Sequence, residues 1–175
     1  MVGLLYFYSK LKLKCMGKLK YLVIHCTATP EGREVTRQDI EQWHIKERGW
    51  SRVGYSDMIH IDGRLENLIE FDQDDNVDPW EVSNGAAGYN STSRHVVYVG
   101  GADKNKPEGF RYFPIKDTRT PEQVETLEIY VRFMILRHPE IKIVGHNQIS
   151  NKGCPSFDVG SWLANICINA KNIGL

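Results

Sequence analysis

The sequence lacks the features that mark several large classes of protein. Its 175 residues carry 22 basic and 22 acidic side chains, so the formal net charge is zero. Nucleic-acid-binding proteins use a basic surplus to collect phosphates, and that surplus is missing. No run approaches the roughly 20 apolar residues that span a bilayer, and there are no internal repeats or low-complexity tracts. We therefore expect no nucleic-acid partner and no transmembrane segment.

Cysteine is also scarce. The chain has 4 cysteines and no CxxC pair, which is too few, in a chain of this length, for a disulfide scaffold. A reducing compartment fits this usage, although the count still allows one bridge.

The first ten residues, MVGLLYFYSK, contain a short apolar run. They lack a basic segment before it and a small-residue cleavage site after it, so they make a poor signal peptide. A second methionine, Met16, stands just before the first expected strand. Residues 1–17 are then either an upstream extension of the true start or a weak export signal, and we favour the extension. The functional domain is expected over residues 18–175.

The remaining sequence alternates strand and helix patterns. Thr36 is expected to be a helix N-cap, with Asp39 at the third position of the helix. Thr120, Pro121 and Gln123 have the residue types of a helix N-terminus with a capping box, and Asp158 can cap a last helix. Apolar runs predict strands over 20–26, 55–62, 95–99 and 141–145. This order predicts one α/β domain with a central mixed β-sheet flanked by helices.

Three potential metal ligands stand next to the ends of predicted strands. His25 closes the first strand, His146 follows the last, and Cys154 lies in the loop beyond it. Because side chains alternate along a strand, Cys26 should point away from His25 and act as a small buried hydrophobe. Spacing alone fits no generic zinc pattern, and on periodicity the three would be scattered core or surface residues.

Five motifs in order change that interpretation. They are VIHCTATP at 23–30, GW and VGY within 49–55, YNSTS and YVGG within 89–101, TPEQ at 120–123, and GHNQ and KGCPSFD within 145–158. Together they resemble the type-2 N-acetylmuramoyl-L-alanine amidases, which include small phage lysozymes of amidase type and peptidoglycan recognition proteins. The resemblance covers roughly residues 19–164.

The resemblance implies a site and a reaction. His25, His146 and Cys154 would be the zinc ligands, leaving the fourth position for the water that acts as nucleophile. The scissile bond would be the amide between N-acetylmuramic acid and L-alanine in peptidoglycan. Tyr55 and Lys152 would be the catalytic residues that orient the water or contact the oxyanion, and their separate roles stay open.

Other functions remain open beside this one. A peptidoglycan-binding module without activity would be expected to lack the cysteine ligand, whereas Cys154 is present. A phage-type regulator of a partner protein, or cleavage of a related amide, is also compatible with the sequence. We expect a monomer, located either in the cytoplasm with release by lysis or in the cell wall after export.

The sequence departs from the family pattern in two places. Ser56 and Asp57 replace a histidine and an aromatic residue, and Arg94 and His95 replace a small apolar pair. Asp57 is expected to share a strand face with Tyr55 and Ile59.

Several other polar and aromatic residues receive plainer interpretations. His44 is expected to be a core histidine with a hydrogen-bond partner, and the acidic cluster around Asp74 a solvated loop. Trp80 and Tyr89 are candidates for stacking on sugar or peptide.

Overall fold

The computed structural model describes residues 17–174. Most of the expected N-terminal extension therefore lies outside the described residues. Gly17, which we assigned to that extension, pairs with Val77, because β1 (Gly17–Lys18) is antiparallel to β6 (Asn76–Val77).

The central sheet has five strands in the order β5-β4-β7-β2-β9. Four of them are parallel and the edge strand β5 is antiparallel, so the expected mixed sheet is confirmed. Their bounds are β2 Tyr21–Cys26, β4 Asp57–Ile59, β5 Leu65–Asn67, β7 Ser93–Tyr98 and β9 Lys142–Gly145.

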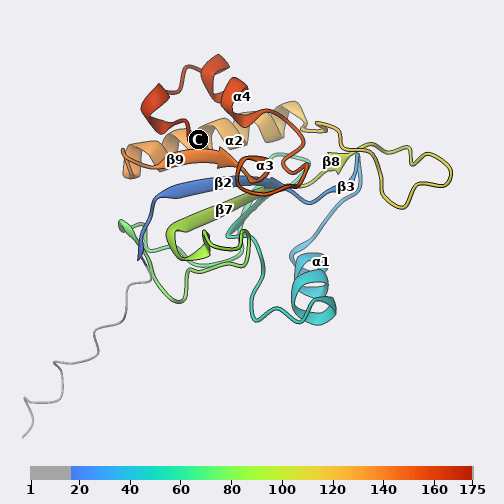
Figure 1. Cartoon of the computed structure of the whole chain (residues 1–175), viewed down its shortest axis with the longest axis horizontal. Coiled ribbons are helices and arrows are strands. Elements are labelled where there is room, and N and C mark those ends of the chain that lie inside the picture. Colours follow the sequence, from blue (N-terminus) through green and yellow to red (C-terminus); the bar gives the residue numbers. More distant parts are fainter. Residues whose placement is uncertain (1–16, 175) are drawn as a thin grey trace, which may run out of the picture.

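Helices cover both faces of this sheet (Figure 1). On one face, α2 (Pro121–Arg137) and α4 (Val159–Asn165) pack over the apolar cluster that contains Leu22, Ile24 and Val96. On the other face, α1 (Arg37–Glu41) continues as a π-helical segment, η1 (Gln42–Glu47), over a second cluster. The result is the predicted single α/β domain with three layers.

The predicted helix signals are confirmed. Thr36 and Thr120 each form a capping box, with Asp39 and Gln123 respectively, and Asp158 caps α4 by accepting from the backbone N–H of Ser161. Sequence periodicity did not identify Gln123 as buried. Its side chain donates to the carbonyl of Val99 at 2.9 Å, so the start of α2 is fixed to the sheet.

The strand predicted over 55–62 is shorter in the structure. β4 covers only Asp57–Ile59, because His60 to Arg64 form the turn of the β4–β5 hairpin. Several short elements were not predicted. Besides β5, β6 and the short helix after β9, they are β3 Thr29–Pro30, β8 Gly101–Ala102, η2 Asn90–Thr92 and η3 Ala170–Asn172.

Asp57 does not share a face with Tyr55, so that expectation was wrong. The strand begins only at Asp57, and its side chain points with Ile59 toward α2, whereas Tyr55 packs against the cluster on the other face. Arg94 on β7 donates two hydrogen bonds to the Asp57 carboxylate, at 2.7 and 3.0 Å. The Tyr130 hydroxyl donates to the same carboxylate at 2.5 Å. A buried, hydrogen-bonded ion pair therefore joins β4 to β7, and Tyr130 extends it to α2.

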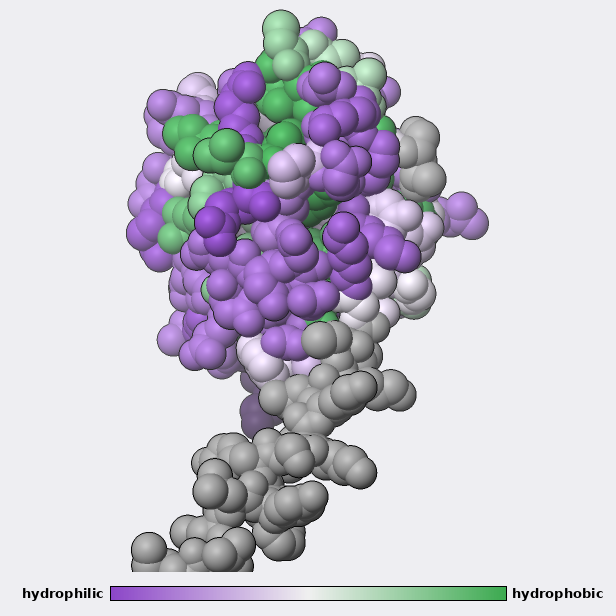
Figure 2. All heavy atoms as spheres, turned by 90° about the vertical axis from the view of Figure 1, so that its left-hand side faces the viewer, coloured by the Kyte–Doolittle hydropathy of each residue, from purple (hydrophilic) through white to green (hydrophobic). Residues whose placement is uncertain are grey.

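The amino-terminal ends of the parallel strands lie at the left of Figure 1. That end is mostly hydrophilic, with apolar groups gathered in its upper part (Figure 2). No helix in the described part of the chain combines the length and apolarity that crossing a membrane requires.

Candidate metal centre

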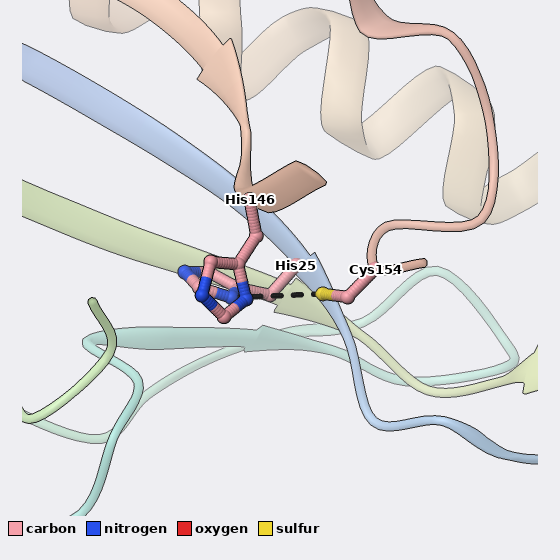
Figure 3. Close-up of side chains that lie close together, drawn as sticks. All are labelled: His25, His146 and Cys154. Atoms are coloured by element: carbon pink, nitrogen blue, oxygen red, sulfur yellow. Dashed lines mark hydrogen bonds between the residues drawn. The ribbon is translucent and has the colours of Figure 1, made fainter. Parts of the chain in front are cut away.

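His25, His146 and Cys154 come together at the carboxyl edge of the sheet (Figure 3). β2 and β9 are parallel neighbours, and Ile24 of β2 is paired with Gly145 of β9. The residues that follow these two, His25 and His146, therefore lie at the same edge of the sheet. His146 begins the short helix α3 (His146–Ile149), which Gln148 stabilises by accepting from the backbone N–H of Gly145 at 2.7 Å.

The geometry of the three side chains fits a common metal ion. One ligand atom from each lies within 4.8 Å of the others, and the Cys154 Sγ is 3.7 Å from the His25 Nδ1. A zinc ion bonds to nitrogen at about 2.1 Å and to sulfur at about 2.3 Å. With a tetrahedral angle between the two bonds, the nitrogen and the sulfur lie about 3.6 Å apart. Within residues 17–174 this is the one group of three or more such side chains able to hold a metal. The donor set suits zinc.

Hydrogen bonds to three strands fix the loop that carries Cys154. The backbone N–H of Cys26 donates to the Cys154 Sγ at 3.2 Å, and the Tyr98 hydroxyl donates to the carbonyl of Pro155 at 2.7 Å. The Ser156 hydroxyl donates to the carbonyl of Gly101 at 2.7 Å. A Cβ at Gly101 would lie 2.4 Å from the Cys26 Sγ, so only glycine allows this approach. Cys26 is buried in the core cluster, as expected, but its Sγ also lies 3.3 Å from the Ser156 hydroxyl and it lines the same cavity as Cys154.

Burial sets the protonation of the ligands. It lowers the pKa of His25 well below the ordinary value, with further effects of His95, His146 and Lys152. It also lowers the pKa of His146 to about 4, aided by Lys152. Both imidazoles are therefore neutral at pH 7, as metal ligation requires. The contact with Cys26 and burial raise the pKa of the Cys154 thiol, so a metal would displace its proton on binding.

Tyr55 and Lys152 both lie beside this cluster. The Tyr55 ring centroid is 5.4 Å from that of His25, and burial raises the pKa of its hydroxyl above the ordinary value. Lys152 is exposed and lines, with Cys154, a cavity of about 470 Å³. Residues 111–113 and Ile115, from the long loop between β8 and α2, also line this cavity. Arg111 and Lys152 are the charged residues of this lining, which has no carboxylate.

Of the plainer interpretations, one is confirmed in full and one in part. The Nδ1 of buried His44 accepts from the backbone N–H of Gly54 at 3.0 Å. Of the acidic cluster expected to be a solvated loop, Asp72, Asp74 and Asp75 are exposed, and Asp74 accepts from the backbone N–H of Asn76. Asp78 is buried, so the expectation fails for that residue.

The structure places the two aromatic candidates away from the ligands. Trp80 lines a different cavity with Asp57 and Arg94, and Tyr89 packs edge-on against Tyr21 at the start of β2. Neither takes part in the metal centre.

Sequence reasoning missed a third histidine at the centre. The Nδ1 of His95 on β7 lies 2.9 Å from the Nε2 of His25, and both side chains are buried. Burial, with His146 and Arg94, lowers the pKa of His95 to about 3, so this ring is neutral as well. The sequence could show that His95 lies in a strand, but not which strand lies beside it. Because β2 and β7 are neighbours and Val23 is paired with His95, alternation places His25 and His95 on the same face of the sheet.

The fold and the site together define a class of protein: an α/β domain with a candidate His–His–Cys metal centre at the carboxyl edge of a mixed sheet. The N-acetylmuramoyl-L-alanine amidase family matches residues 16–157. The chain belongs to that family, and the prediction of an amidase that acts on peptidoglycan is confirmed.

Two phage proteins are among its relatives. The endolysin of Enterobacteria phage K11 is 37% identical over 141 residues, which cover 80% of this chain and 82% of the endolysin. The endolysin of Klebsiella phage KP32 is 35% identical over 155 residues, 88% and 91% of the two chains.

Solved structures agree on the fold. The amidase LysC from Clostridium intestinale URNW superposes with a TM-score of 0.65 at 21% identity, over 90% of this chain and 91% of that one. Wild-type Drosophila PGRP-LB superposes with a TM-score of 0.60 at 21% identity, over 88% and 86%.

Proposed function

We propose that this protein hydrolyses the amide between the lactyl group of N-acetylmuramic acid and the L-alanine of the stem peptide, with zinc held by His25, His146 and Cys154. The observation that carries the proposal is the convergence of two neutral imidazoles and one thiol at distances that suit a tetrahedral ion. When bound, zinc supplies Lewis-acid activation of a water molecule and of the amide carbonyl.

The cavity beside the ligands is where the substrate would lie. Its lining combines two cations, no carboxylate and the rings of Tyr112 and Phe113. Stem peptides carry carboxylates, so the charge of this lining complements them. The loop that supplies Arg111 to Phe113 is held at its base, where Asp103 and Lys116 donate backbone hydrogen bonds to Pro114 and Gly101.

Lys152 and Tyr55 are the groups available for catalysis. We assign to the Lys152 ammonium group the stabilisation of negative charge on the amide oxygen as the carbonyl carbon becomes tetrahedral. Tyr55 keeps its proton because burial raises the pKa of its hydroxyl, so it acts as a hydrogen-bond donor that orients water or the oxyanion.

The test is digestion of purified cell-wall sacculi followed by mass spectrometry of the products. Cleavage at the proposed bond releases stem peptides with a free N-terminal L-alanine and leaves lactyl carboxylates on the glycan. A chelator should abolish the release, and added zinc should restore it. Release of fragments cut at another amide, or activity that survives complete zinc removal, would contradict the proposal.

A matched pair of variants separates catalysis from binding. Cys154→Ala should still bind sacculi while releasing no peptide, whereas Cys167→Ala, changed at an exposed thiol, should behave as the wild type. A Cys154→Ala protein as active as the parent would show that the cluster does not carry the reaction.

A further inference from the structure

The contact between His25 and His95 joins two neighbouring parallel strands beneath the candidate metal centre. The His25 Nε2 and the His95 Nδ1 are 2.9 Å apart, and both residues are almost fully buried. One of these nitrogens must carry the hydrogen of this bond, because two lone pairs at that distance would repel each other.

The metal cluster decides which nitrogen donates. The His25 Nδ1 faces the Cys154 Sγ at 3.7 Å and is the atom that would bind the ion. A neutral imidazole that binds a metal through Nδ1 carries its hydrogen on Nε2. The Nε2–H of His25 therefore donates to His95, whose Nδ1 accepts and whose own hydrogen sits on Nε2.

The surroundings hold the His95 ring in this position. A Cβ at Gly85 would lie 2.3 Å from the His95 Nδ1, so the absence of a side chain there makes room for the ring. The Ser56 hydroxyl accepts from the backbone N–H of His95 at 3.2 Å. Ser56 also donates its backbone N–H to the carbonyl of His95 at 2.7 Å, so two hydrogen bonds join these residues.

Packing alone explains the His95 ring poorly. Its Nε2 is buried and has no hydrogen-bond partner among the described residues, and an unpaired buried donor costs stability. The bond to His25 is the polar side-chain contact that the ring makes in the structure. A second partner on a ligand imidazole commonly fixes its tautomer and orientation in metal sites.

We propose that His95 is a positioning residue that fixes the tautomer and orientation of His25 for metal binding. The inference rests on the proposed metal centre. It goes beyond the metal centre by assigning a function to His95, a residue outside the proposed ligand set.

Two variants of nearly equal size test the role. In His95→Asn the side-chain oxygen can occupy the place of Nδ1 and accept from His25, whereas His95→Leu has the same branching and no acceptor. Zinc affinity, measured by competition with a chromophoric chelator, should fall by about 10- to 100-fold in the Leu variant and stay close to wild type in the Asn variant. The visible spectrum of the cobalt-substituted protein should change in the Leu variant alone.

Equal zinc affinity in the Leu variant and the wild type would overturn the proposal. An equal loss of zinc affinity in both variants would also overturn it, because the effect would then come from packing of the ring and not from its hydrogen bond. Nitrogen-15 NMR of the metal-free wild type decides the case if the variants do not fold. A hydrogen on the His25 Nε2 supports the proposal, and a hydrogen on Nδ1 overturns it. A wild-type protein that binds no zinc would instead refute the metal centre itself, while the tautomer remains measurable.

Discussion

The backbone N–H of Cys26 donates a hydrogen bond to the Sγ of Cys154 at 3.2 Å. This bond joins the end of β2 to a loop 128 residues further along the chain, and it places the thiol beside the neighbouring His25. A sulfur that already accepts from a backbone N–H is oriented before any metal arrives, and the donor would favour its thiolate.

Removal of this sulfur should eliminate tight metal binding. Cys154→Ser keeps a small polar side chain but loses the soft thiolate that suits zinc. We expect zinc affinity to fall by on the order of 100-fold or more, because even outer-shell changes cost 10- to 100-fold, and activity to fall with it. Metal content after dialysis and peptide release from sacculi measure the two effects. Cys167→Ser is the control, and parallel losses in it would point to general damage.

Replacement of Lys152 should affect turnover more than metal binding. Its ammonium group is assigned to the charge that develops on the amide oxygen, and loss of one such donor typically lowers kcat by about 10²- to 10³-fold. Lys152→Ala should show this loss with zinc affinity at or above the wild-type value. The positive charge of Lys152 acts on both ligand histidines, whose pKa values it lowers, and the same charge repels a metal cation held between them. Steady-state kinetics and zinc titration are the measurements. An unchanged kcat would remove Lys152 from the mechanism.

Breaking the buried ion pair on the other face should reduce stability. Arg94→Met leaves the Asp57 carboxylate buried without its cation, and such a change costs about 3–5 kcal/mol in the free energy of unfolding. Arg94→Met with Asp57→Leu removes both charges and should recover most of that loss. Urea denaturation measures both variants. If the double variant is no more stable than the single one, the charges are not the source of the effect.

Acid should destabilise the fold partly through His44. Its pKa is about 4 in the folded protein and 6.5 ordinarily, mainly because of burial and then because of Arg48. Below pH 6.5 His44 becomes protonated in the unfolded chain, whereas in the folded protein it stays neutral down to about pH 4. The stability from this group is therefore complete above pH 6.5 and is lost as the pH falls toward 4.

His44→Asn should reduce this pH dependence, because the Asn oxygen can accept from Gly54 in place of Nδ1 and does not titrate. The slope of unfolding free energy against pH between 6 and 4.5 should decrease by up to about 1.4 kcal/mol per pH unit. Urea midpoints over that range are the measurement, and an identical slope in variant and wild type would contradict the assignment.

Local sequence signals determined much of the architecture. The caps at Thr36, Thr120 and Asp158, and the apolar runs that became β2, β7 and β9, appear in the structure close to where they were predicted. These features depend on neighbouring residues in the chain, whose hydrogen bonds and periodicity can be recognised without knowledge of the fold. The candidate ligands were identified by resemblance, since their spacing alone favoured no metal site.

The tertiary structure decided what depends on strand order and register. Tyr55 and Asp57 lie on opposite sides of the sheet because β4 begins only at Asp57. Arg94 forms its ion pair with Asp57 because β4 and β7 are neighbouring strands. His95 became a partner of His25 only through the pairing of β7 with β2. Strand pairing joins segments far apart in sequence, so the contacts that orient the metal centre exist only once the chain has folded.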